Sequence, residues 1–171
     1  ADDGRIFLPG SDTERIITDD ALAARVEKKL RTLDIDRTVY LAWLYKTGGI
    51  DTSILHFVKT ATDLGRSPMD KLYLPWIKEV RYAAGKVGNE SHRYLQFVRF
   101  VKVGNTKTDE SGLYIADIEP LYDILPLIAN HFAQRFGSQR FIIRDKARRC
   151  ALVWDTDRWY ITELAELLDA E

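Results

Sequence analysis

The stretch Arg93-Tyr-Leu-Gln-Phe-Val-Arg-Phe-Val-Lys-Val103 alternates polar and apolar residues, and this period predicts a β-strand. In a strand, Arg93 and Arg99 would share one face with the apolar Phe97, because side chains two residues apart point the same way. Arginine mixed with apolar side chains on one face is typical of a binding surface. The preceding residues, Glu90-Ser-His-Arg93, add a carboxylate and an imidazole. We therefore expect function to be concentrated in this part of the chain.

The residues before this stretch have mainly helical periodicity. Two short β-prone pieces, Arg5–Pro9 and Arg15–Thr18, come first. The expected helices then cover Ala21–Leu30, Asp36–Thr47, Ile54–Leu64 and Met69–Val87. Glycine ends helices in the left-handed conformation, so Gly88-Asn89 is interpreted as the end of the fourth helix.

The residues after it return to the alternating period of strands. Leu113–Ile118 is expected to pair with the first strand as a hairpin across the polar loop Gly104–Gly112. One helix, Ile124–Phe136 with Asp123 as its N-cap, and three strands, Phe141–Ile143, Ala151–Trp154 and Trp159–Ile161, follow. We predict an α+β fold with a helical N-terminal half and a mainly antiparallel, β-β-α-β-β-like sheet. The chain, residues 1–171, is expected to form a single domain, mostly helical over 1–88 and sheet-containing over 89–171.

The composition limits the class of protein. With 171 residues, 46% of them hydrophobic, the chain can bury a proper core. No apolar run approaches the roughly 20 residues that cross a bilayer, and the first residues do not resemble a signal peptide, so we expect a cytoplasmic protein. The single cysteine, Cys150, excludes an internal disulfide and any cysteine-rich metal site built from this chain alone. We predict no bound metal and no cofactor.

The net charge of −1 conceals a separation of charge along the chain. Residues 71–107 carry eight lysines or arginines against Glu79 and Glu90, and residues 135–149 carry six against Asp145. A basic face on a nearly neutral protein is the electrostatic signature of a polyanionic partner. An ordinary solvated surface is the alternative, and charge alone does not separate the two.

Basic residues interleaved with aromatic residues predict a nucleic-acid-binding surface, since arginines hold phosphates and aromatic rings stack on bases. The candidate phosphate-binding residues are Arg93, Arg99, Lys102, Arg135, Arg144 and Arg148. The structural alternative is that most of the aromatic residues fill the core, which we expect for Phe97 or Phe100, and for Phe132, Phe136 and Trp154.

An enzymatic alternative uses the histidines and carboxylates. Glu90, His92, Glu119 and His131 would then be general acid or base groups of a hydrolase or lyase acting on a nucleotide or nucleic acid. The sequence has no His-Glu-x-x-His, Walker or Gly-x-Ser-x-Gly motif to support one reaction. The carboxylates also have a structural interpretation: Glu90 with Arg93 or Arg135, and Asp145 with Arg148, would form internal ion pairs.

Several separated motifs, in order, resemble one family. They are Thr18-Asp19 with Ala24-Arg25-Val26; Glu90-Ser-His-Arg93 with Phe97-Val-Arg-Phe100; Tyr114-Ile-Ala116 and Ile118-Glu-Pro120; Leu125-Pro-Leu-Ile128; His131-Phe132 with Arg135-Phe136; and Ile143, Asp145 and Arg148. The resemblance covers nearly the whole chain. It is to a bacterial family of unknown biochemical activity that is described as a DNA metabolism or DNA repair protein.

The resemblance implies DNA, single-stranded or damaged, as a ligand. It further implies a radical S-adenosylmethionine protein, or a uracil-DNA-glycosylase-like protein, as the partner. Members of the family begin with a further strand and helix before the region of Arg5, so we expect this chain to be a shortened version. Fold or neighbourhood alone does not establish chemistry, and a module that binds only proteins is a third alternative.

Overall fold

The computed structural model describes residues 19–46, 48–103 and 112–165. Its elements are α1 (Asp20–Thr32), α2 (Asp36–Leu44), α3 (Ile50–Leu64), α4 (Pro75–Phe97), β1 (Val101–Val103), β2 (Leu113–Ile118), α5 (Leu125–Phe136), β3 (Phe141–Asp145), β4 (Cys150–Trp154) and β5 (Trp159–Glu163). The α+β prediction is confirmed. The expected strands Arg5–Pro9 and Arg15–Thr18, and most of the predicted loop Gly104–Gly112, lie outside the described residues.

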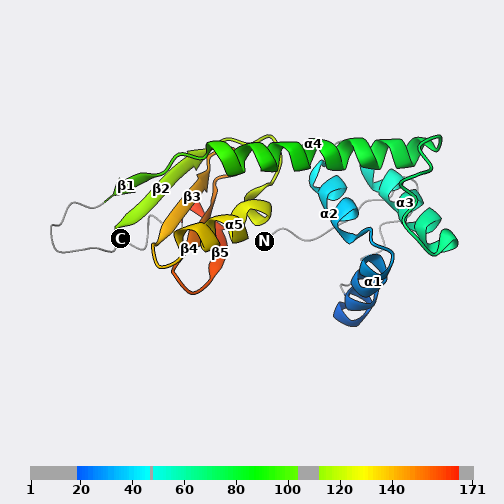
Figure 1. Ribbon diagram of the computed structural model, residues 1–171, viewed down its shortest axis with the longest axis horizontal. Helices are drawn as coiled ribbons and strands as arrows, with labels where there is room; N and C mark the ends of the chain where they lie inside the picture. Colours follow the sequence, from blue (N-terminus) through cyan, green and yellow to red (C-terminus); the bar gives the residue numbers. More distant parts are fainter. Residues whose placement is uncertain (1–18, 47, 104–111, 166–171) are drawn as a thin grey trace.

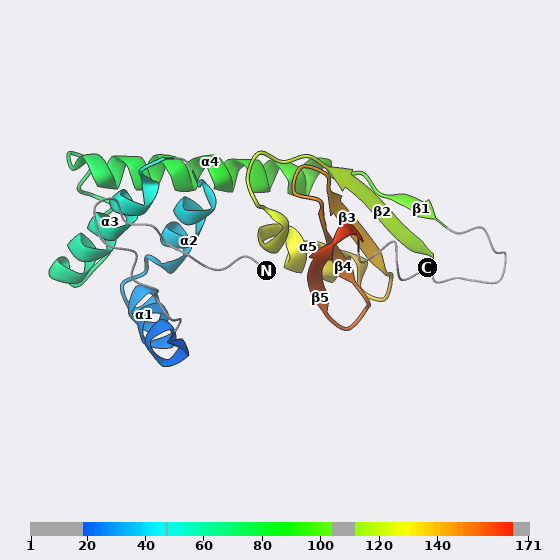
Figure 2. The ribbon, with the colours of Figure 1, turned by 180° about the vertical axis from the view of Figure 1, so that it is seen from behind.

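The helix α4 runs along both halves of the molecule (Figures 1 and 2). Its first half packs against α2 and α3, and α1 adjoins α2; we call these elements together the helical lobe, whose core includes Phe57, Ile77 and Val80. Its last turns lie against the strands and α5, which we call the sheet lobe. Pro75 occupies the first turn, where its missing N–H leaves no bond unmade. One helix therefore belongs to two hydrophobic cores.

The continuation of α4 corrects two predictions. Residues Arg93–Phe97 are helical, so the predicted strand Arg93–Val103 is wrong except for Val101–Val103. Gly88 does not end the helix, since it keeps a right-handed conformation within α4. The reason is burial: the positions 77, 80, 84, 87 and 91 are buried, positions 94 and 98 pack against the sheet core, and all of them recur every three or four residues. Tertiary packing of this stripe overrides the local alternation.

The sheet has the order β1-β2-β3-β4-β5, and only the β2–β3 pair is parallel. That parallel pair needs a crossover, which α5 supplies. The strands therefore follow the order β-β-α-β-β-β. One face, with Ala116, Phe141 and Leu152, packs on α5 and on the C-terminal end of α4. The register places Ile115, Ile142 and Val153 on the opposite face.

Candidate functional site

A groove of about 460 Å³ lies where α4 ends beside β2. Its lining residues are Arg93, Tyr94, Phe97, Val98, Arg99, Asp117 and Ile118, and we call it the α4–β2 groove. The groove exists because β1 is short: it pairs with Leu113–Ile115 only. The edge of β2 at Asp117 and Ile118 therefore has no β1 partner, and the extended residues after α4 pass beside it.

Two arginines line this groove, and both are exposed to solvent. The Arg93 side chain is 67% exposed, and its nearest carboxylate oxygen, on Glu90, is 3.9 Å away. Arg99 is exposed and has no ion-pair partner among the residues that the structure describes. The prediction placed both on one strand, and the structure brings them together differently: Arg93 projects from the helix, and Arg99 follows the extended Val98. An anion in the groove would meet both.

Phe97 is the aromatic residue of the groove and is 68% exposed. Phe100, three residues on, is packed instead against Phe132, Phe136 and Phe141, with ring centroids 4.5 to 5.7 Å away. The expectation that one of Phe97 and Phe100 belongs to the core is thus met by Phe100. Phe132 is buried, and Phe136 and Trp154 pack against the same core, as predicted.

Asp117 gives the groove one negative charge, which two cations compensate. The Arg144 Nε donates to its carboxylate at 2.6 Å, and the Lys146 Nζ lies 2.9 Å away. Hydrogen bonds from these two groups hold the pKa of Asp117 below its ordinary value. Neither Asp117 nor Lys146 was among the predicted site residues. The pairing of β2 with β3 would have identified Asp117, because Asp117 and Arg144 are direct cross-strand partners.

Tyr94 lies at the inner side of the groove, half-buried against the sheet core. Burial, and then the negative charge of Glu90, raises the pKa of its phenol.

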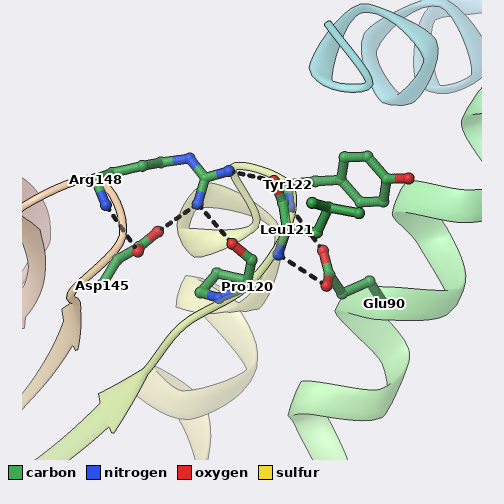
Figure 3. A network of polar contacts seen from close by, with 6 residues as sticks. All are labelled: Glu90, Pro120, Leu121, Tyr122, Asp145 and Arg148. Atoms are coloured by element: carbon green, nitrogen blue, oxygen red, sulfur yellow. Dashed lines mark hydrogen bonds and ion pairs between the residues drawn. The ribbon is translucent and has the colours of Figure 1, made fainter. Parts of the chain in front are cut away.

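Glu90 belongs to a polar network that joins α4 to the segment after β2 (Figure 3). Its two carboxylate oxygens accept the backbone N–H groups of Leu121 and Tyr122 at 2.9 and 2.8 Å, and the residue is 9% exposed. This carboxylate therefore anchors the segment after β2 to α4. The predicted ion pair with Arg93 is present only at 3.9 Å, and the alternative pairing with Arg135 is not formed.

Arg148 closes the same network from the other side (Figure 3). Its guanidinium donates to the Pro120 and Leu121 carbonyl oxygens at 3.0 and 2.6 Å, and to the fully buried Asp145 carboxylate at 2.9 Å. Asp145 also accepts the Arg148 backbone N–H at 3.1 Å. The predicted Asp145–Arg148 pair is confirmed. The Arg148 donors are thus used within the protein, unlike those of Arg93 and Arg99 in the described part of the chain.

The other predicted site residues are spread over the surface. His92 is exposed, and its Nε2 lies 3.0 Å from the Nε2 of Gln96, one helical turn along α4. His131 and Arg135 are exposed on α5, and Glu119 is exposed beside the buried Pro120. Neither histidine lines the α4–β2 groove, and neither do Glu90 and Glu119.

A second cavity of about 330 Å³ is lined by residues 44–46 of the helical lobe and by residues 121–123 and Arg148 of the sheet lobe. Tyr45 from the helical lobe meets Tyr122 from the sheet lobe there, with ring centroids 5.4 Å apart. None of the four predicted catalytic residues lines it.

Within residues 19–46, 48–103 and 112–165, no three histidine, cysteine or carboxylate side chains cluster in a way that could hold a metal ion. No helix in that part of the chain is long and apolar enough to cross a bilayer.

The fold and the groove define an α+β protein with a basic-aromatic recess at the end of its longest helix. Residues 49–170 match the family described as "Domain of unknown function (DUF4130)". The chain belongs to this family. No curated protein and no solved structure gave a significant match to the chain.

Proposed function

We propose that this protein binds nucleic acid through the α4–β2 groove and acts as an accessory protein of DNA metabolism or repair. The supporting observation is the groove itself, where Arg93 and Arg99 flank an exposed phenylalanine. Arginine side chains bind phosphate through charge-assisted hydrogen bonds. Arg144 and Lys146 lie at the Asp117 end of the groove and add positive charge there.

The partner is part of the same proposal. The ordered motifs resemble proteins that work beside a radical S-adenosylmethionine protein or a uracil-DNA-glycosylase-like protein. In this proposal the accessory protein supplies the nucleic-acid contact and the partner supplies the reaction. An enzymatic role for Glu90 receives less support, because both of its oxygens already accept backbone N–H groups.

Fluorescence anisotropy with labelled DNA at several salt concentrations tests the proposal. We expect the affinity to fall as salt rises, because each phosphate contact releases counterions from the DNA. Arg93→Ala and Arg99→Ala should each weaken binding and make the salt dependence shallower, by a slope of about one. Arg158→Ala is the matched control, since its side chain is 79% exposed and lies on the turn between β4 and β5.

The same titration can also refute the proposal. A wild-type protein that binds no DNA at low salt, or Arg93 and Arg99 variants that bind as tightly as the wild type, would remove the groove as the nucleic-acid site. Binding of the partner is measured separately, by co-purification of the full chain with a candidate radical S-adenosylmethionine protein.

A further inference from the structure

Phe97 has an environment unlike that of the other phenylalanine rings around the sheet lobe. It is 68% exposed and makes no ring contact with the residues that the structure describes. A single exposed apolar side chain is common on protein surfaces. Here, however, the ring lies in the same groove as two arginines that are also exposed. The combination suits a ligand that is both aromatic and anionic.

The backbone explains how the three side chains meet. Arg93 and Phe97 are four residues apart on α4, so they project from the same side of the helix. The helix ends at Phe97, and Val98 is extended, with φ −61° and ψ 125°. The chain therefore leaves the helix direction before Arg99. The ring lies between the two cations along the chain, and all three residues line one recess.

We infer that the α4–β2 groove takes single-stranded nucleic acid, with an unpaired base stacked on Phe97 and the adjoining phosphates bound by Arg93 and Arg99. This inference rests on the proposed function and adds the substrate class to it. In a duplex the faces of the bases are covered by their neighbours, so a protein ring stacks only on a base that is unpaired or displaced. A duplex would offer this groove its phosphates alone.

Asp117 contributes to the orientation of such a strand. Its carboxylate lies at the β2 side of the groove, and a phosphate there would meet a negative charge as well as the cations Arg144 and Lys146. Among the residues that the structure describes, no carboxylate lies within ordinary hydrogen-bonding distance of the arginines on the α4 side. The phosphates are therefore held on the α4 side, next to the ring.

The test compares a labelled single strand of about 16 nucleotides with a duplex of the same length. The wild-type protein should bind the single strand more tightly. Phe97→Ala should weaken single-strand binding by about 5- to 150-fold, the range that loss of one base–aromatic stack produces. Binding to the duplex should be unchanged by this variant. Phe97→Trp should retain single-strand binding, since it keeps an aromatic face.

Two controls separate a lost contact from a lost fold. Tyr73→Ala removes a ring that is 76% exposed just before α4 and should leave both affinities unchanged. The urea midpoint of Phe97→Ala is measured in parallel, and we expect it to match the wild-type value because the ring is exposed.

The outcomes distinguish this inference from the function on which it rests. Equal affinity for the two probes, with Phe97→Ala binding normally while Arg99→Ala does not, overturns the single-strand inference and leaves nucleic-acid binding standing. The same holds if Tyr73→Ala weakens binding as much as Phe97→Ala. No binding of either probe at low salt overturns both.

Discussion

Glu90 and Arg148 hold the backbone of Leu121 from opposite sides: Glu90 accepts its N–H at 2.9 Å, and Arg148 donates to its carbonyl oxygen at 2.6 Å. Glu90 comes from α4, and Arg148 comes from the turn between β3 and β4. Leu121 itself is 73% exposed, so it is the backbone, not the side chain, that is held. The segment after β2 is thereby fixed to both the long helix and the sheet.

Removing the Glu90 carboxylate should destabilise the protein. In Glu90→Ala, two backbone N–H groups lose their acceptor, and a buried donor without a partner costs about 1 to 3 kcal/mol. We expect Glu90→Ala to lower the free energy of unfolding by about 2 kcal/mol, and Glu90→Gln to lower it less, because its amide oxygen still accepts one bond. Urea denaturation measures both. Glu27→Ala, in an exposed pair on α1, is the control, and equal effects of Glu27→Ala and Glu90→Ala would refute the anchoring role.

Arg148→Lys should also be destabilising, although it keeps the charge. The guanidinium donates at once to two carbonyl oxygens and to Asp145, and an ammonium group on a flexible stem does not reproduce this fixed fork. We expect a loss of about 1 to 3 kcal/mol in the free energy of unfolding. Arg158→Lys makes the same replacement at a side chain that is 79% exposed, and it should have little effect. A stable Arg148→Lys protein would show that the fork is dispensable.

The stability contribution of Asp117 should depend on pH. Its pKa is lowered by hydrogen bonds from Arg144 and Lys146, so the ionised form favours the folded state. This contribution is fully present above the ordinary aspartate pKa of about 4, and it is lost as the pH falls through the lowered folded-state value. Asp117→Asn should therefore be less stable than the wild type at neutral pH, and the two should converge in acid.

Urea midpoints of the two proteins across a pH series measure this convergence. Asp63→Asn, which disrupts an exposed pair with Lys59 at 3.7 Å, provides the comparison for an ordinary surface charge. A gap between wild type and Asp117→Asn that stays constant from neutral to strongly acidic pH would argue against the ion-pair explanation.

The continuity of α4 through Gly88 can be tested with two substitutions. Gly88 is helical, and a Cβ atom there would lie 3.8 Å from Leu41 Cδ1, an ordinary van der Waals contact. Gly88→Ala should therefore raise the free energy of unfolding by up to about 1 kcal/mol, and Gly88→Pro should lower it by about 3 kcal/mol or more.

Gly49 supplies the contrasting case. It is the N-cap residue of α3, with φ of 85°, a left-handed conformation that disfavours alanine, so Gly49→Ala should be destabilising. Thermal or urea unfolding compares the three variants. If Gly88→Ala were as harmful as Gly49→Ala, α4 would not pass through this position as a regular helix.

The fold class and most elements were predictable because their periods and end signals agree. The α5 helix with its buried stripe ending at Gly137, and the strands β2 to β5, follow this rule. The structure of residues 88–100 was not predictable, because the local sequence signals contradict the packing. Gly88 suggests the end of a helix, and Arg93–Val103 alternates like a strand. These residues stay helical because the stripe that includes Val87 and Tyr94 is largely buried in the folded protein, and the local sequence does not show this burial.

The candidate site was predictable in its residue types but not in its arrangement. Arg93 and Arg99 were correctly grouped, although the strand that would have joined them does not form. The recess depends on where β1 begins and on the free edge of β2, and pairing register of this kind is set by tertiary structure. The separation of Glu90 from His131 has the same origin, since they lie on different helices.

The long helix also affects how the protein unfolds. At about 1.5 Å per residue, its 23 residues extend for about 34 Å, and they supply Ile77 to one core and Tyr94 to the other. Melting either lobe removes the support of a helix on which the remaining lobe is built. The two halves should therefore lose structure together in one cooperative transition, although each has a separate core.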